Sequence, residues 1–419
     1  MRRKLLLPLA LICLFSCKKN PEVKQEPIPN NKAVAWVKSF GGTDYDFANA
    51  VIQLQNGDYL FAGNTRSTNG DIPGTRWGYD AWLTKVDNSG TKVWSQTYGD
   101  HDDDYGMAAA ATPDGGFLLV GYTFNNTLNR AWAVKTDAYG VKSWQKDLSP
   151  STDAKALAMI PNGDGTYLIA GYTSTSGNRD GWLKKIDASG NELWNKTFGG
   201  SSEDWFTSIV KNTDGSYSVA GYTNSRDGDI SSTKGSFDGW VMRIDASGNK
   251  LWSRNFGGSS DDYLNGIIKT SDGGIIAAGN TKSSDGDISL NHGSLDEWIV
   301  KLDASGNKSW IKTYGGGNEE YITSIAPSVN NDGGFLTLGY TNSTTGDVFR
   351  PNNNYSGWLM RFDSDGNKKG ASTYGHTSLY DDKTNALITT QDGGYMIGGF
   401  TWADGRGYDA WLVKVGELQ

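Results

Sequence analysis

Short apolar runs separated by turn residues make up nearly the whole chain from residue 34 onward. In one stretch the runs cover 206–211, 217–223, 239–245 and 250–256, and they are rich in Val, Ile, Tyr and Trp. Asp-Gly and Ser-Gly-Asn turns separate them. Apolar runs of this length between turn residues are typical of β-strands joined by hairpins, and these segments show no helical period. The pattern predicts an all-β protein.

Four such runs form a unit that recurs seven times. Each copy carries Gly-Gly, an acidic pair, Asp-Gly-Gly-Tyr, Gly-x-Thr and Asp-x-Trp-Leu-x-Lys in the same order, with substitutions. A tryptophan in the third run marks each copy, at spacings of 50 to 60 residues: Trp82, Trp132, Trp182, Trp240, Trp298, Trp358 and Trp411. Sheets repeated in this way must bury both faces against their neighbours. We therefore expect a seven-bladed β-propeller with four antiparallel strands per blade.

The two ends of the repeat array are incomplete in complementary ways. The last copy stops at 412–415, one run short, while a spare run with the usual tryptophan, Trp36, precedes the first copy at 34–40. We predict that Ala35 to Phe40 forms the outer strand of the blade built from residues 380–416. The N-terminal strand would then close the ring, since an open array would leave strand edges exposed.

The first 32 residues differ from the rest. A basic start is followed by an apolar stretch, Leu5 to Phe15, which is too short to span a bilayer. Leu-Phe-Ser-Cys follows, which resembles the lipobox of bacterial lipoproteins and makes Cys17 the expected lipidation site. We expect residues 1–16 to be a signal peptide, 17–32 a lipidated, disordered tether and 33–419 the propeller. This predicts an outer-membrane lipoprotein of the cell envelope, periplasmic or surface-exposed.

Charge and cysteine content narrow the classes of partner. The formal net charge is −8, and −11 without Arg2, Arg3 and Lys4, which argues against nucleic acid and leaves the lipid anchor as the expected membrane contact. The only other cysteine, Cys13, lies in the expected signal peptide. The exported protein would therefore have no disulfide and would depend on its core, as a monomeric propeller.

Three phrases carry a family resemblance: FGGSSDDY at 256–263, SDGGIIAAGNT at 271–281 and DEWIVKLDASGNKSW at 296–310. The chain resembles the secreted bacterial β-propeller repeat proteins common in Bacteroidetes, and its strand pattern is also similar to quinoprotein-type propellers. Members of the first group are often described as bulb-type lectin-like or endoglucanase-like. The resemblance implies the fold and an extracytoplasmic location.

Acidic residues recur at two places in the repeat and raise the question of calcium. Pairs such as Asp261 and Asp262 precede the first run of a copy, and long loops in four copies share Ser-x-x-Gly-Asp: the loop acids are Asp71, Asp229, Asp287 and Asp347. Calcium prefers six to eight oxygens, so these acids are candidate ligands. Acids that accept backbone N–H groups in glycine-rich turns recur for structural reasons alone. We favour the structural interpretation and expect no cofactor, with Ca²⁺ as the alternative.

Residues that break the repeat on the loop face are the candidate ligand-binding residues. They are Trp77, His101, Phe124, Arg130, His292, Arg350, His376, Trp402 and Arg406. Aromatic and arginine side chains suit carbohydrate stacking or a protein interaction hot spot. Because copies two, three and seven have short loops, a groove is expected over that sector.

Catalytic motifs are not found. The three histidines lie in different copies and no HExxH, Cys-x-x-Cys, Walker loop or Gly-x-Ser-x-Gly is present. Paired carboxylates also suggest glycoside hydrolysis, but near-identical copies supply the same environment repeatedly, whereas the two acids need different ones. The leading hypothesis is a non-enzymatic binding or scaffolding module for a protein or glycan partner. A glycan-acting enzyme and a purely structural envelope lipoprotein are the alternatives.

Overall fold

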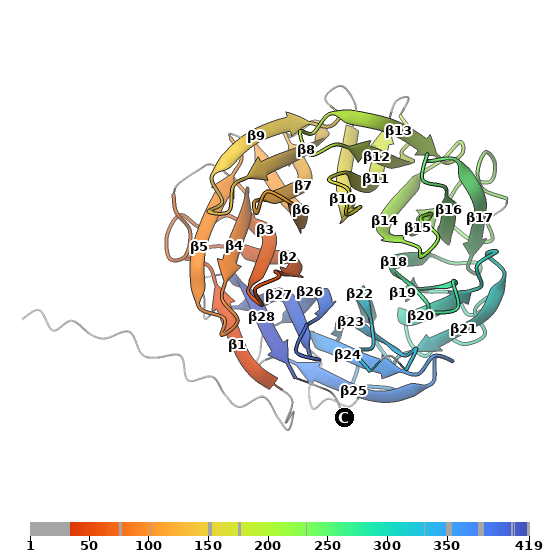
Figure 1. Ribbon diagram of the computed structural model, residues 1–419. Coiled ribbons are helices and arrows are strands. Elements are labelled where there is room, and N and C mark those ends of the chain that lie inside the picture. Colours follow the sequence, from red (N-terminus) through yellow and green to blue (C-terminus); the bar gives the residue numbers. More distant parts are fainter. Residues whose placement is uncertain are drawn as a thin grey trace, which may run out of the picture.

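The computed structural model describes residues 34–74, 78–100, 102–149, 153–174, 177–231, 233–330, 332–348, 354–375, 381–403, 405 and 407–416. These residues form 28 β-strands in seven four-stranded sheets arranged around one axis (Figure 1). The protein is a seven-bladed β-propeller of the all-β class, as the repeat predicts. Among the residues described, no helix is long and apolar enough to cross a membrane.

Six blades are consecutive in sequence, and the seventh combines both ends of the described chain. In order, the blades are β2 (Asp46–Gln53), β3 (Tyr59–Thr65), β4 (Asp80–Val86) and β5 (Lys92–Tyr98); β6 (Asp103–Ala111), β7 (Phe117–Phe124), β8 (Asn129–Thr136) and β9 (Lys142–Asp147); β10 (Asp153–Pro161), β11 (Tyr167–Ser174), β12 (Asp180–Ile186) and β13 (Glu192–Phe198); β14 (Asp204–Lys211), β15 (Tyr217–Thr223), β16 (Asp238–Ile244) and β17 (Lys250–Phe256); β18 (Asp262–Lys269), β19 (Ile275–Thr281), β20 (Asp296–Leu302) and β21 (Lys308–Tyr314); β22 (Glu320–Pro327), β23 (Phe335–Thr341), β24 (Ser356–Phe362) and β25 (Lys368–Tyr374); β26 (Asp382–Thr389), β27 (Tyr395–Trp402), β28 (Tyr408–Val415) and β1 (Val34–Phe40).

The marker tryptophans form the core between blades. All seven are at most 2% exposed, and each belongs to an apolar cluster that spans two neighbouring blades. Trp132 of blade 2, for example, packs with Leu60, Ala62 and Leu83 of blade 1. The second and third strands are buried along nearly their whole length, which explains their continuous apolar runs.

Strand β1 closes the ring, as predicted from the spare run. It pairs antiparallel with β28 from Val34 opposite Val415 to Phe40 opposite Ala410, and Figure 1 shows it on the outside of the last blade. Trp36 packs against a cluster that includes Tyr59 and Trp82 of blade 1. The closing strand therefore contributes to the interface between blades 7 and 1 as well as to its own sheet.

The propeller has two faces with different connections. One face carries the loops that lead into the first strand of each blade and the loops that join the second strand to the third. We call it the loop face. These loops contact each other, since Asp71 donates its N–H to the carbonyl of Gly41 at 2.9 Å. The opposite face, which carries the tight hairpin turns, is the turn face. Val415 pairs with Val34 on one side and with Tyr395 on the other. Tyr395 is the first residue of β27, directly after a hairpin turn, so Val34 and Val415 both lie on the turn face.

Candidate functional site

The second acid of each pair is a structural element of the loop face. Asp46 accepts hydrogen bonds from Thr65 Oγ1, from Ser67 Oγ at 2.7 Å and from the Gly42 N–H at 2.8 Å. Asp204 and Asp262 repeat this arrangement in blades 4 and 5. Burial raises the pKa of these carboxyls against the lowering effect of their hydrogen bonds.

A second carboxylate lies near each of five buried acids, across the blade interface. A Cβ on Gly99 would be 2.2 Å from Oδ2 of Asp104 and 2.9 Å from Oδ1 of Asp80, so the two carboxylates lie on either side of one glycine. Burial raises the pKa of Asp104 to about 7, and the Asp80 charge adds to this. The other pairs are Asp46 with Asp409, Asp204 with Asp180, Asp262 with Asp238, and Glu320 with Asp296. Five near-equivalent pairs fit a structural role better than one asymmetric catalytic pair.

The loop acids proposed as weak calcium ligands are paired with lysines. Asp71 accepts from Lys92 at 2.5 Å, and Asp287 from Lys308 at 2.8 Å and from Lys234. Asp229 and Asp347 pair with Lys250 and Lys368. Each also accepts an N–H from the glycine that ends the preceding outer strand.

Asp261 is held similarly, by Lys282 at 3.0 Å. Within the described part of the chain, no three His, Cys, Asp or Glu side chains are grouped so that they could hold a metal ion. The acids thus have protein partners, and the expectation of no cofactor, with Ca²⁺ as the alternative, stays a prediction for experiment.

The predicted ligand residues fall into two groups. Trp77, His101, Arg350, His376 and Arg406, like Cys17, lie outside the described residues. The other four lie over three blades: Phe124 ends β7 and Arg130 is in β8 of blade 2, His292 precedes β20 in blade 5, and Trp402 ends β27 in blade 7.

The structure does not bring these four side chains together. Arg130 Nε is buried without a hydrogen bond in the described structure, and His292 Nδ1 contacts Asp296 Oδ2 at 2.8 Å. Trp402 alone joins a larger aromatic group, through Tyr408 at 5.2 Å between ring centroids.

This aromatic group, which we call the collar, surrounds the propeller axis at the loop face. Most of its rings come from three positions: the residue after the buried acid, the residue opposite that position on the second strand, and the residue just before the third strand or at its start. Tyr45, before β2, and Trp402, at the end of β27, complete it. The members are Tyr45, Phe47, Tyr79, Tyr105, Tyr122, Tyr172, Trp205, Tyr222, Phe237, Tyr263, Tyr321, Tyr340, Tyr355, Phe400, Trp402 and Tyr408. All except Tyr172 are partly exposed, and eleven of the chain's 20 tyrosines belong to it.

The collar rings form three arcs of continuous ring contact. The first arc covers blades 7, 1 and 2 and runs from Trp402 through Tyr408, Phe47, Tyr79 and Tyr105 to Tyr122. The second covers blades 3 to 5, from Tyr172 to Tyr263. The third is the blade 6 cluster of Tyr321, Tyr340 and Tyr355.

Three cations of the protein lie on collar rings. Lys155 Nζ is 3.9 Å from the Tyr122 ring centroid, and Lys383 Nζ is 4.7 Å from that of Tyr355. Arg179 contacts the rings of Tyr172 and Trp205 at 5.1 and 5.5 Å, and it also pairs with Asp153 and Glu203, each at 3.1 Å. The collar thus combines aromatic, cationic and acidic groups.

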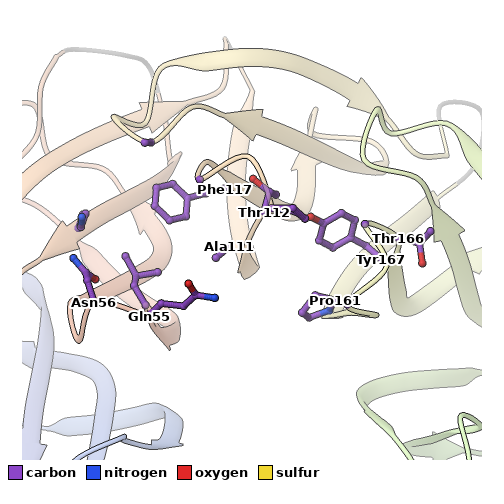
Figure 2. A pocket seen from close by; sticks show the side chains of 15 residues that line it. Gln55, Asn56, Ala111, Thr112, Phe117, Pro161, Thr166 and Tyr167 are labelled. Atoms are coloured by element: carbon purple, nitrogen blue, oxygen red, sulfur yellow. The ribbon is translucent and has the colours of Figure 1, made fainter.

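A cavity of about 550 Å³ lies on the turn face, across blades 1, 2 and 3 (Figure 2). Its lining includes Phe117, Pro161 and Tyr167. In blades 1 and 4 the last residue of the inner strand bridges to the preceding blade's turn: Gln53 Oε1 accepts from the Gln391 N–H, and Lys211 donates to the Asn162 carbonyl. At the equivalent positions Ala111 and Pro161 are too short or too rigid to form such bridges. This cavity lies on the face opposite the groove expected from the sequence.

Sequence reasoning missed the collar because it set aside residues that obey the repeat. Tyr105, Trp205, Tyr263 and Tyr321 follow the acidic pairs in register, so symmetry seemed to account for them. The signal was present in the sequence: the position after the buried acid is aromatic in five copies and lysine in the other two, where Lys383 follows Asp382 and Lys155 follows Ala154 in place of the acid.

Glu297 in β20 was also missed, although it does break the repeat. The equivalent residue is Gly or Ala in all other copies: Ala81, Ala131, Gly181, Gly239, Gly357 and Ala410. Glu297 is 0% exposed, and within the described part of the chain neither carboxyl oxygen has a hydrogen-bond partner of good geometry. Burial raises its pKa well above the usual value; the Thr337 hydroxyl opposes this, whereas the charges of Asp347, Glu320 and Asp296 add to it.

No protein-family model matches the chain, and no curated protein matches it. Among solved structures, the chain is similar to YCF48 bound to a D1 peptide, with 11% identity over 94% of this chain and 97% of that one and a TM-score of 0.51. It is also similar to Chaetomium thermophilum Sqt1 bound to the N-terminus of ribosomal protein L10 (12% identity, 93% and 100% coverage, TM-score 0.49). A Dyadobacter fermentans protein of unknown function is similar as well, with 10% identity over 91% of this chain and 99% of that one and a TM-score of 0.48. At these identities the likeness concerns the fold alone.

Proposed function

We propose that this chain is a membrane-anchored, extracytoplasmic propeller that binds a protein partner through the collar without catalysing a reaction. The observation that carries the proposal is the collar itself, a partly exposed group of mostly tyrosine rings at one face of the fold. Tyrosine provides a large contact area with little conformational entropy to lose, together with a hydroxyl for hydrogen bonds, and it is enriched in protein interfaces.

A protein segment suits the collar better than a glycan. Lys155, Arg179 and Lys383 lie over several ring faces, and ring pairs such as Phe47 and Phe400 meet edge to face. Ring edges, hydroxyls and charges are therefore the groups presented most, and these match peptide groups and side chains. YCF48, a propeller of similar fold, was solved with a D1 peptide bound, so such a ligand is compatible with this architecture.

The location in this proposal follows from the lipobox-like sequence at Cys17. Because Val34 lies on the turn face, a tether of residues 17–33 would join the propeller opposite the collar. Fully extended, such a tether reaches at most about 60 Å. An anchored propeller would therefore direct its turn face to the membrane and its collar to the partner.

The proposal is tested by comparing the two faces of the protein. Full-length protein is immobilised and exposed to an envelope extract, with Tyr105→Ser, Trp205→Ser and Tyr321→Ser as collar variants and Asn56→Ser and Pro161→Ser as turn-face controls. We expect collar variants to retain at least about fivefold less of the same bound protein, and the controls to retain it fully.

Retention that is equal in all five variants would overturn the proposal. A glycan array run with the same variants separates the glycan alternative, because collar-dependent glycan binding without protein retention would replace the protein partner by a glycan.

A further inference from the structure

The collar cations show which ligand chemistry this surface accepts. Lys155, on the inner strand of blade 3, places its ammonium over a tyrosine ring of blade 2. Lys383, on the inner strand of blade 7, places its ammonium over two tyrosine rings of blade 6. Arg179 combines ring contact with two carboxylates. A cation over an aromatic face is a favourable arrangement, and the described residues form it at three places around the ring, once together with two carboxylates.

The middle of the first arc has the same rings and acids. At the positions equivalent to Lys155 and Lys383 it has Tyr105 and Phe47, which contact Tyr79 at 5.6 and 6.2 Å. Asp103 accepts the Tyr79 N–H at 2.9 Å. Burial raises the pKa of the Tyr79 hydroxyl; the charge of Arg66 opposes this, and the charges of Asp44 and Asp103 add to it. Asp381 acts in the same way on Tyr408. Rings and carboxylates are therefore adjacent here, as they are where the protein places its own cations.

The described residues supply this part of the collar with only a loosely held cation. Arg66 Nε lies 3.8 Å from Asp44, both side chains are well exposed at 52% and 40%, and no described ring contact involves Arg66. In contrast, Arg179 holds two acids at 3.1 Å, and Lys282 holds Asp261 at 3.0 Å. Asp44 is thus held less closely than Asp153, Glu203 and Asp261, and no ion pair to Asp103 is formed within the described part of the chain.

From this arrangement we infer that the middle of the first arc, at Tyr79 and Tyr105 beside Asp103, is a subsite for a lysine or arginine side chain of an extended segment of the partner. The inference rests on the proposed function, because it specifies what the collar recognises. Charge complementarity supports it, since the chain has a net charge of −8 and a basic segment would be attracted to it.

The probes are fluorescent octapeptides of Gly and Ser that contain two arginines, two lysines, two citrullines or two phenylalanines. Citrulline keeps the shape of arginine without its charge. With full-length protein at low salt, we expect the arginine and lysine peptides to bind at least about fivefold tighter than the citrulline peptide, and this advantage to shrink in 0.5 M salt.

Matched variants locate the subsite. Asp103→Asn and Tyr105→Leu should weaken arginine-peptide binding about five- to tenfold. Asp261→Asn removes the equivalent acid of blade 5, which pairs with Lys282, and should change arginine-peptide binding less than twofold, as should the turn-face control Asn56→Ser. Lys383→Gln uncovers the rings of Tyr340 and Tyr355 and should add a second binding equivalent, a gain that a misfolded variant would not give.

Two results would overturn the inference: citrulline binding as tightly as arginine, or equal losses in the blade 2 and blade 5 variants. If phenylalanine peptides bind with dependence on Tyr105 while charge has no effect, the collar remains the binding site and only the basic specificity is wrong. If no collar variant changes either peptide binding or partner retention, the proposed function is wrong as well.

Discussion

Replacing Glu297 by methionine should stabilise the protein, and increasingly so as the pH rises. The residue occupies a position that faces the next blade, because a Cβ at the equivalent Gly239 would meet Trp298 and Leu264 of blade 5. At the Glu297 position this places a carboxyl between blades 5 and 6. Methionine has a similar volume and no polar oxygen, so Glu297→Met removes the buried polar group without opening a large cavity.

The magnitude follows from two contributions. An unpartnered buried polar group costs about 1–3 kcal/mol, which sets most of the expected gain near pH 4.5, where the glutamate is protonated in the folded state and about half protonated in the unfolded state. The folded pKa is raised above the unfolded value, so the wild type loses stability as the pH rises from the unfolded pKa towards the folded one. The loss is at most about 1.4 kcal/mol per pH unit. The advantage of methionine should therefore widen between pH 4.5 and 7.5.

Urea denaturation followed by tryptophan fluorescence at pH 4.5, 6.0 and 7.5 measures this difference. Glu297→Gln should lose the pH-dependent part while it keeps a buried polar group. Glu192→Met, at a side chain 49% exposed, serves as the control and should show no widening. If Glu297→Met is less stable than wild type, or its advantage is the same at all three pH values, the carboxyl has a partner and our reasoning is wrong.

Three further predictions concern closure, anchoring and calcium. Deleting residues 33–40 exposes the edge of β28 and removes Trp36 from the interface, so we expect aggregation or a loss of several kcal/mol; an unchanged melting temperature would exclude the closing role. Cys17→Ser should move the protein from the membrane to the soluble fraction and abolish acyl labelling, and a variant that still sediments beside an unlipidated wild type would contradict anchoring. Melting in millimolar Ca²⁺ and in EDTA should differ by no more than a few degrees, because the acids already have lysine and N–H partners; a larger shift that disappears in Asp261→Asn with Asp262→Asn would identify a metal site.

The architecture was predictable because the repeat encodes it redundantly. The marker tryptophans, the turns and the spare strand each indicate the same ring, and a closed ring has few alternatives. A lysine or arginine lies three residues after each marker tryptophan. A cation on a strand packed on both faces needs an acidic partner. In the part of the chain that the structure describes, five of them contact the aspartate of their own blade's hairpin turn: Lys85, Lys135, Arg243, Lys301 and Lys414. Register along the chain is sufficient for such predictions, because both partners belong to one blade.

The candidate site was less predictable, because it depends on contacts between blades and on exposure. Tyr79 and Tyr105 belong to different copies and occupy different positions in the repeat. Only the packing of blade 1 against blade 2 brings their ring centroids to 5.6 Å. Likewise, sequence shows that Glu297 replaces a small residue, but not that Thr337 of the next blade faces it in place of the apolar residue found there in other copies. The role of a residue, whether it follows the repeat or departs from it, can be interpreted only once its contacts with the neighbouring blade are known.

The position of β1 also has a mechanical consequence. This strand runs from Val34 on the turn face to Phe40 near the loop face. If Cys17 is anchored and a partner holds the collar, tension between membrane and partner passes lengthwise through β1. Hydrogen bonds of an antiparallel pair lie perpendicular to the strands, so such a load shears the β1–β28 bonds together instead of opening them one at a time. The strand that closes the ring is thereby placed where it resists pulling best.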